Sequence, residues 1–192
     1  MNPSGFFAMV FRQKYIRRWG LMHNVCPESL SEHAMEVATL SHALATIGNR
    51  LFQKKYDVGY AVSLALFHDV PEVFTGDLPT PVKYHSDASR DSYRQVEEHA
   101  IATLLEKLPA ELREPYAEML LPNPAFPEHQ LVKMADKLAA YLKCVEEEKC
   151  GNHDFNSAKE TIRAALDAYD APELTYFCEK FLPAFSLTLD QL

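Results

Sequence analysis

Apolar residues recur at helical intervals over most of this 192-residue chain, and that spacing decides which folds are open to it. The clearest segment follows Ser29, where Glu32 three residues later gives the signature of a helical capping box. One face of this segment carries His33, Val37, Leu40, Leu44 and Ile47. We predict a helix over residues 29–48, with His33 in its first turn and on the side that faces inward.

Other segments show the same periodicity, and stretches that contain Gly or Pro separate them. The helices expected are residues 6–19, 57–68, 89–108, 111–121, 128–149, 155–169 and 172–181. The first should end in the cluster Arg17-Arg18-Trp19, with Gly20 as its C-cap. We find no convincing β-alternation, so the prediction is an all-α fold that forms a single domain over residues 1–192.

The charge balance restricts the class of partner. The chain has 27 acidic and 19 basic residues, and its net charge of -8 argues against polymeric nucleic acid or a membrane as partner. The N-terminal FFAMVF run is too short for a membrane span, and its basic residues follow it, where a signal peptide needs them in front. Four cysteines without a CxxC pair indicate reduced, mostly buried thiols. A soluble, cytoplasmic protein is expected.

The stretch from residue 64 to 83, LALFHDVPEVFTGDLPTPVK, places polar side chains directly after an apolar run. His68 and Asp69 follow LALF at the end of a predicted buried helix, where an unpaired carboxylate would be costly. The pair is therefore either part of a metal site or a mutually satisfied core pair. A second pair, His153-Asp154, lies in a polar turn, and there Asp154 is expected to be an N-cap.

Two further residues can complete such a site. On its own, His33 is more simply a hydrogen-bonded core histidine, and Asp136 on the helix 128–149 is more simply a partner of a neighbouring lysine. Taken together, the four residues supply two imidazoles and two carboxylates, a set that suits Mn²⁺, Co²⁺, Fe²⁺ or Zn²⁺. The candidate metal ligands are His33, His68, Asp69 and Asp136.

The order H…HD…D is also the signature of the HD-domain metal-dependent phosphohydrolases, which are all-helical. The chain resembles the bacterial 5′-deoxynucleotidases of the YfbR-like family in four stretches, RRWGLMHN, SLSEHAMEVA, HDVPEVFTGDLPTPVKY and VKMADKLAAYLKC. The resemblance runs from Phe6 to the C-terminal PAFSLTLD, and GDLPTPVKY is not shared by HD proteins at large. It implies a metal-dependent homodimeric enzyme that hydrolyses deoxyribonucleoside 5′-monophosphates to deoxynucleoside and phosphate.

The resemblance implies a role for each motif residue. The four candidate ligands would hold one divalent ion, with Co²⁺ or Mn²⁺ expected ahead of Zn²⁺, Fe²⁺ or Mg²⁺. Arg18 would orient the substrate phosphate for catalysis, and Trp19 would recognise the deoxyribose. Glu72 would handle a proton or place the attacking water, and Asp69 would serve catalysis and substrate binding as well as the metal. The segment that contacts the nucleotide would be Asp77, Leu78, Pro79 and Thr80.

These residue types suit the roles. The planar fork of an arginine can contact two phosphate oxygens at once, and a helix would turn Arg17 about 100° away from Arg18. Helical continuation would put Glu72 on nearly the same face as Asp69. Each residue also has a simpler interpretation: Arg18 as a solvated helix end, Glu72 as a surface glutamate, and residues 77–80 as turn formers.

Two other functions compete with this one. An HD phosphohydrolase could act on a nucleoside triphosphate or a guanosine alarmone, but alarmone hydrolases carry an additional acid after the HDxxE glutamate, where this chain has Val73. A nucleotide-binding sensor without catalytic activity is the third interpretation, and the intact set of candidate ligands weakens it.

Overall fold

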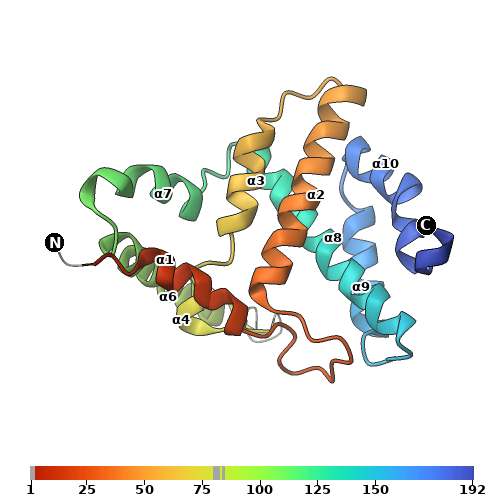
Figure 1. The fold of residues 1–192 in the computed structure, drawn as a ribbon, viewed down its shortest axis with the longest axis horizontal. Helices are drawn as coiled ribbons and strands as arrows, with labels where there is room; N and C mark the ends of the chain where they lie inside the picture. Colours follow the sequence, from red (N-terminus) through yellow and green to blue (C-terminus); the bar gives the residue numbers. More distant parts are fainter. Residues whose placement is uncertain (1–2, 80–82, 84) are drawn as a thin grey trace.

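The computed structural model describes residues 3–79, 83 and 85–192 and consists of helices joined by loops (Figure 1). The α-helices are α1 (Phe6–Val10), α2 (Leu30–Leu51), α3 (Val58–Phe67), α4 (Glu72–Thr75), α6 (Asp87–Glu106), α7 (Arg113–Leu120), α8 (Pro127–Lys149), α9 (Asn156–Asp167) and α10 (Pro172–Lys180). Short 3₁₀ helices are η1 (Phe11–Tyr15), η2 (Ala110–Leu112), η3 (Leu182–Ser186) and η4 (Leu189–Gln191). The described residues contain no β-strand, and the predicted all-α class is confirmed.

Side-chain caps start the two central helices. Both halves of the capping box form at α2: the Glu32 main-chain N–H donates to Ser29 Oγ at 3.3 Å, and the Ser29 N–H donates to the Glu32 carboxylate at 2.7 Å. At α3, the Tyr60 N–H donates to the carboxylate of Asp57 at 2.9 Å. The sequence signal at residue 29 therefore fixes where α2 begins.

The start of α9 differs from the prediction for Asp154. The helix begins at Asn156, its N-cap position is Phe155, and no side chain in the described part of the chain caps it. Asp154 lies in the preceding turn, where its main-chain N–H donates to Asn152 Oδ1 at 3.1 Å. The predicted N-cap role of Asp154 is wrong, because the turn extends past it before the helix starts.

The N-terminal helix predicted over residues 6–19 is also wrong beyond Tyr15. Ile16 is extended (φ -96°, ψ 123°), and an isolated antiparallel bridge pairs Arg17 with Ser29. The Leu30 N–H donates to the Ile16 carbonyl at 3.0 Å. Main-chain bonds to a distant segment thus replace those that would continue the helix, and Gly20 caps nothing.

Two hydrophobic clusters hold the helices together. One lies among α2, α3, α8, α9 and α10, and the other joins α1, α6 and α7 (Figure 1). The end of α3 and the turn after it belong to both, because Ala65 packs in the first cluster and Val70 in the second. His68 and Asp69 therefore lie where the two clusters meet.

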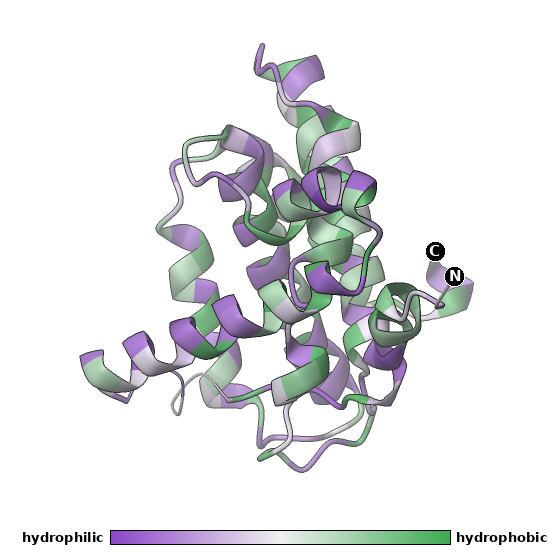
Figure 2. Ribbon diagram, turned by 90° about the vertical axis from the view of Figure 1, so that its left-hand side faces the viewer, coloured by the Kyte–Doolittle hydropathy of each residue, from purple (hydrophilic) through white to green (hydrophobic). Residues whose placement is uncertain are grey.

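Hydrophobic and hydrophilic residues alternate along most helices, as expected when each turns one face inward (Figure 2). Among the described residues, no helix combines the length and the apolar character needed to cross a membrane. The prediction of mostly buried thiols is wrong, because Cys144 is buried while Cys26 and Cys178 are half-buried and Cys150 is exposed.

Candidate active site

The four predicted metal ligands come together from three parts of the chain. His33 lies in the first turn of α2, Asp136 lies in α8, and His68 and Asp69 follow α3. His33 Nε2 is 2.9 Å from Asp136 Oδ1 and 3.8 Å from Asp69 Oδ2. His68 Nε2 is 3.1 Å from Asp69 Oδ2 and 4.0 Å from Asp136 Oδ1. Two imidazoles and two carboxylates thus face one another.

The hydrogen bonds of His68 fit a metal ligand. Its Nδ1 is 2.6 Å from the carbonyl oxygen of Ala65, which can only accept, so Nδ1 carries the proton. Its Nε2 is buried and makes no well-aligned hydrogen bond in the described residues, although Asp69 Oδ2 lies 3.1 Å away. Once Nε2 gives up its proton to a metal ion, its lone pair faces the carboxylates while a carbonyl fixes the second nitrogen, which is the usual arrangement of a metal-binding histidine. His33, His68 and Asp136 each offer a ligand atom within 4.8 Å of the others, so the residues fit a divalent ion.

Electrostatics within the cluster follow from its packing. Burial opposes charge on both His68 and Asp69, but the Asp69 carboxylate raises the pKa of His68 to about 9. The same interaction, with help from His33, lowers the pKa of Asp69 against its burial. Asp136 contacts the imidazoles, and no lysine in the described residues lies within ion-pair distance of it. The salt bridge considered for Asp136 is therefore not formed.

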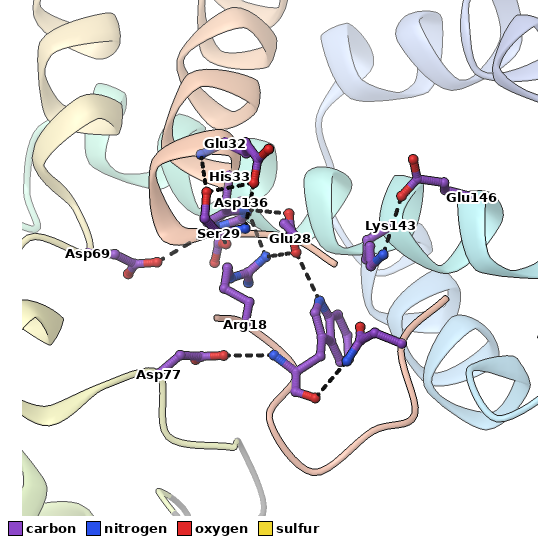
Figure 3. A network of polar contacts seen from close by, with 12 residues as sticks. Arg18, Glu28, Ser29, Glu32, His33, Asp69, Asp77, Asp136, Lys143 and Glu146 are labelled. Carbon is purple, nitrogen blue, oxygen red and sulfur yellow. Dashed lines mark hydrogen bonds and ion pairs between the residues drawn. The ribbon is translucent and has the colours of Figure 1, made fainter. Parts of the chain in front are cut away.

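Arg18 lies beside the cluster, although not on a helix. Its main-chain N–H donates to the Glu28 carbonyl at 3.0 Å, next to the bridge between Arg17 and Ser29. Its NH1 group donates to Glu28 Oε2 at 3.0 Å and lies 2.8 Å from His33 Nδ1 (Figure 3). Arg17 is exposed. The prediction that a helix turns Arg18 and not Arg17 toward the site is wrong, because neither residue is helical. The bridge between Arg17 and Ser29 brings Arg18 to the cluster.

Trp19 has a left-handed backbone conformation that several hydrogen bonds stabilise. Its φ is +60°, a region that bulky residues rarely adopt. Its N–H donates to Asp77 Oδ2 at 3.0 Å, and its carbonyl accepts from the Met22 N–H at 2.8 Å and from Asn24 Nδ2 at 3.1 Å. The indole Nε1–H donates to Glu28 Oε2 at 3.2 Å. Strained backbone that its surroundings hold in place is frequent at functional sites.

Glu72 is buried at the start of α4 and is held through one oxygen. Lys83 Nζ donates to Glu72 Oε1 at 2.5 Å, while Oε2 is buried with no partner in the described residues. Burial and the nearby Asp69 raise the pKa of Glu72 to about 7, and Lys83 acts in the opposite direction. A carboxyl that titrates near neutral pH can give or take a proton. The interpretation as a surface glutamate is wrong, since Glu72 is 3% exposed.

Comparison with known proteins identifies the family of this chain. The family described as 5′-deoxynucleotidase YfbR-like matches residues 5–185. The chain belongs to this family. The 5′-deoxynucleotidase YfbR of Escherichia coli is 44% identical, and the match covers 100% of this chain and 97% of that protein. The predicted membership of the YfbR-like enzymes is confirmed.

Solved structures agree on the fold of the YfbR-like chain. An HD-domain phosphohydrolase from Listeria innocua has a TM-score of 0.83 at 22% identity, with 94% of this chain and 87% of that chain covered. The HD phosphohydrolase DatZ of cyanophage S-2L, solved with dA and one catalytic Zn²⁺ ion, has a TM-score of 0.67 at 21% identity, with 94% and 96% covered. These likenesses confirm the HD-domain fold.

The remaining predicted residues of the YfbR-like chain lie after α4. Asp77 is bound to the main chain of Trp19, Leu78 and Pro79 are half-buried, and Thr80 lies outside the described residues. The sequence did not predict Glu28 or Lys83 as part of the site. Lys83 ends the motif stretch and could have been inferred from it. Nothing in the spacing around Glu28 marks that residue.

Proposed function

We propose that the protein is a metal-dependent 5′-deoxynucleotidase that hydrolyses deoxyribonucleoside 5′-monophosphates to a deoxynucleoside and phosphate. The observation that carries the proposal is the convergence of two imidazoles and two carboxylates beside Arg18 and Trp19 in a chain of this family. His33, His68, Asp69 and Asp136 would hold the ion. A bound divalent ion supplies Lewis-acid chemistry, polarising the phosphoryl oxygens and lowering the pKa of a water. Co²⁺ or Mn²⁺ is the expected ion, and the Zn²⁺ of the cyanophage enzyme makes Zn²⁺ the first alternative.

Arg18 is the phosphate-binding residue in this proposal. Its side chain is 12% exposed, so the guanidinium is largely removed from water, where an interaction with an anionic phosphate is strongest. Its planar fork can donate to two phosphate oxygens and so fix the phosphate relative to the metal ligands. Trp19, adjacent in sequence, would contact the sugar of the bound nucleotide, and Asp77 holds its main chain.

Glu72 is the proton-handling residue. Lys83 occupies Oε1, so Oε2 is the oxygen that can hold the transferable proton. A carboxyl with a pKa near 7 can deliver that proton to the leaving 5′-oxygen or take one from the attacking water. The nucleotide segment at residues 77–80, the homodimer and the cytoplasmic location stay predictions.

The test is phosphate release by the full-length protein after removal of metal and single restoration of Co²⁺, Mn²⁺, Zn²⁺ and Mg²⁺. Deoxyribonucleoside monophosphates should be hydrolysed, ribonucleotides poorly, and nucleoside triphosphates and alarmones not at all. Asp69→Ala and Glu72→Ala should lose at least about 100-fold in rate. Full activity in either variant would refute the site, and equal hydrolysis of triphosphates would favour the competing phosphohydrolase function.

Trp19→Ala tests sugar recognition directly. An apolar wall alone rejects an added hydroxyl by only about 10², so the indole should press against C2′ and leave no room for a 2′-hydroxyl. We expect the variant to lose preference for deoxynucleotides more than it loses turnover on them. Steady-state rates on a deoxy/ribo pair with the same base measure this, and an equal loss on both sugars would contradict it.

A further inference from the structure

Glu28 lies at the point where the substrate-binding and metal-binding residues meet. It occupies the loop before α2, and the main-chain bond from Arg18 to its carbonyl sets the two residues side by side. The residue is 7% exposed, which is rare for a glutamate without a specific partner. No motif considered above includes it.

Both carboxylate oxygens face side-chain nitrogen atoms. Oε2 accepts from Arg18 NH1 at 3.0 Å and from Trp19 Nε1 at 3.2 Å. Oε1 lies 3.6 Å from His33 Nδ1, is buried, and has no hydrogen-bond partner in the described residues. One side chain therefore touches the phosphate-binding arginine and the sugar-facing tryptophan and leaves an open acceptor beside a metal-binding histidine.

The open acceptor has a use once His33 binds a metal. Since His33 Nε2 is the nitrogen that faces the two aspartates, a metal there requires the proton on Nδ1. Arg18 NH1, now 2.8 Å from Nδ1, is also a donor, and two donors cannot share that contact. Glu28 Oε1 is then the acceptor available to Nδ1–H, in the manner of the carboxylates that orient metal-binding histidines.

We propose that Glu28 is the positioning residue that holds Arg18, Trp19 and His33 in one arrangement, so that substrate binding is aligned with the metal. The proposal rests on the proposed deoxynucleotidase function. In this arrangement the two oxygens of Glu28 accept from three donors. A glutamine cannot replace it, because its amide has only one acceptor oxygen and its NH2 group would face a donor. Glu28→Gln therefore changes charge and bonding without changing volume.

The experiment compares Glu28→Gln with Glu173→Gln in the full-length protein. Glu173, in α10, is also buried (1% exposed), and its carboxylate accepts a hydrogen bond from Tyr56 Oη at 2.6 Å. The Glu173→Gln variant therefore controls for the loss of a buried carboxylate. Co²⁺ is titrated calorimetrically into each metal-free protein. Glu28→Gln should bind Co²⁺ about 10–100-fold more weakly, the usual cost of removing such a partner, whereas Glu173→Gln should match wild type.

The same proteins are assayed on a deoxy- and a ribonucleotide with the same base. Glu28→Gln should raise KM, lower kcat and reduce the deoxy/ribo preference, because Arg18 and Trp19 lose their shared anchor. Wild-type Co²⁺ affinity with wild-type sugar preference would overturn the proposal, as would equal losses in Glu173→Gln.

If Glu28→Gln does not fold, Glu28→Asp replaces it, and wild-type values there overturn the proposal in the same way. A wild-type protein that binds Co²⁺ but releases no phosphate would defeat the proposed function instead, while the titrations still test Glu28.

Discussion

At the level of single residues, the ion pair between Lys83 and Glu72 should set the pH dependence of the reaction. Burial raises the pKa of Glu72 to about 7 and Lys83 opposes the rise, so Lys83→Met removes a cation that favours the charged carboxylate. The pKa of Glu72 should then increase further, by roughly one unit or more for a contact this close. The limb of the kcat/KM profile that reports Glu72 should move to higher pH by that amount.

The limb of the profile that moves also tells which proton Glu72 handles. If Glu72 donates to the leaving oxygen, the alkaline limb moves up, and if it takes a proton from water, the acidic limb moves up. Lys83→Arg keeps the positive charge and should leave the limb near its wild-type position. An unchanged profile in Lys83→Met would show that the ion pair does not control the titration.

At the level of elements, Glu147 attaches the loop before α2 to the end of α8. Its carboxylate is fully buried and accepts from the main-chain N–H groups of Val25 and Cys26, both at 2.9 Å, and from Lys143 Nζ and Asn152 Nδ2, both at 2.6 Å. Burial opposes the charge, but Lys143 and the other donors lower the pKa of Glu147 from 4.5 to about 2. This loop carries Glu28, so the attachment supports the site.

The lowered pKa gives a pH-dependent contribution to stability. Because the unfolded value is higher, the contribution is complete above pH 4.5 and is lost as the pH falls toward about 2. We expect Glu147→Gln to lower the free energy of unfolding by about 2–3 kcal/mol at pH 7, with the difference from wild type narrowing below pH 4.5. Urea unfolding at pH 7 and pH 3 measures both. The side chain of the neighbouring Glu146 is 57% exposed, so Glu146→Gln should change the free energy of unfolding by less than about 0.5 kcal/mol. A loss as large as that of Glu147→Gln would contradict the role given to Glu147.

Elements whose stability is local were predictable from the sequence, and those that depend on distant pairing were not. The start of α2 follows from Ser29 and Glu32, which lie within one turn of each other. The helix predicted to reach Trp19 ends early because Ile16 bonds to Leu30, a partner that periodicity does not reveal. The same limit hid Glu28, which the bridge brings to Arg18. The His68-Asp69 pair can be located because charged side chains are unusual after an apolar run, whereas the roles of Arg18 and Trp19 follow only from the family resemblance.

At the level of the whole molecule, the proposed metal site would join parts of the chain that lie far apart in the sequence. Its candidate ligands come from α2, from the turn after α3 and from α8, and that turn lies between the two hydrophobic clusters. The unfolded chain holds no such site, so an ion bound by the folded state must stabilise the entire fold.

Metal should therefore raise the melting temperature of the protein. At 100 times its dissociation constant, an ion that binds only the folded state adds about 2.7 kcal/mol, which corresponds to roughly 5–10 °C for a chain of this size. Thermal melts with Co²⁺ or Mn²⁺, reversed by a chelator, measure the shift. Asp136→Ala should abolish it, because one oxygen of this carboxylate lies within 4.0 Å of both imidazoles. Asp154 belongs to the His-Asp pair in the turn before α9, so Asp154→Ala should retain the full shift in melting temperature. An equal shift in Asp136→Ala would place the metal elsewhere on the molecule.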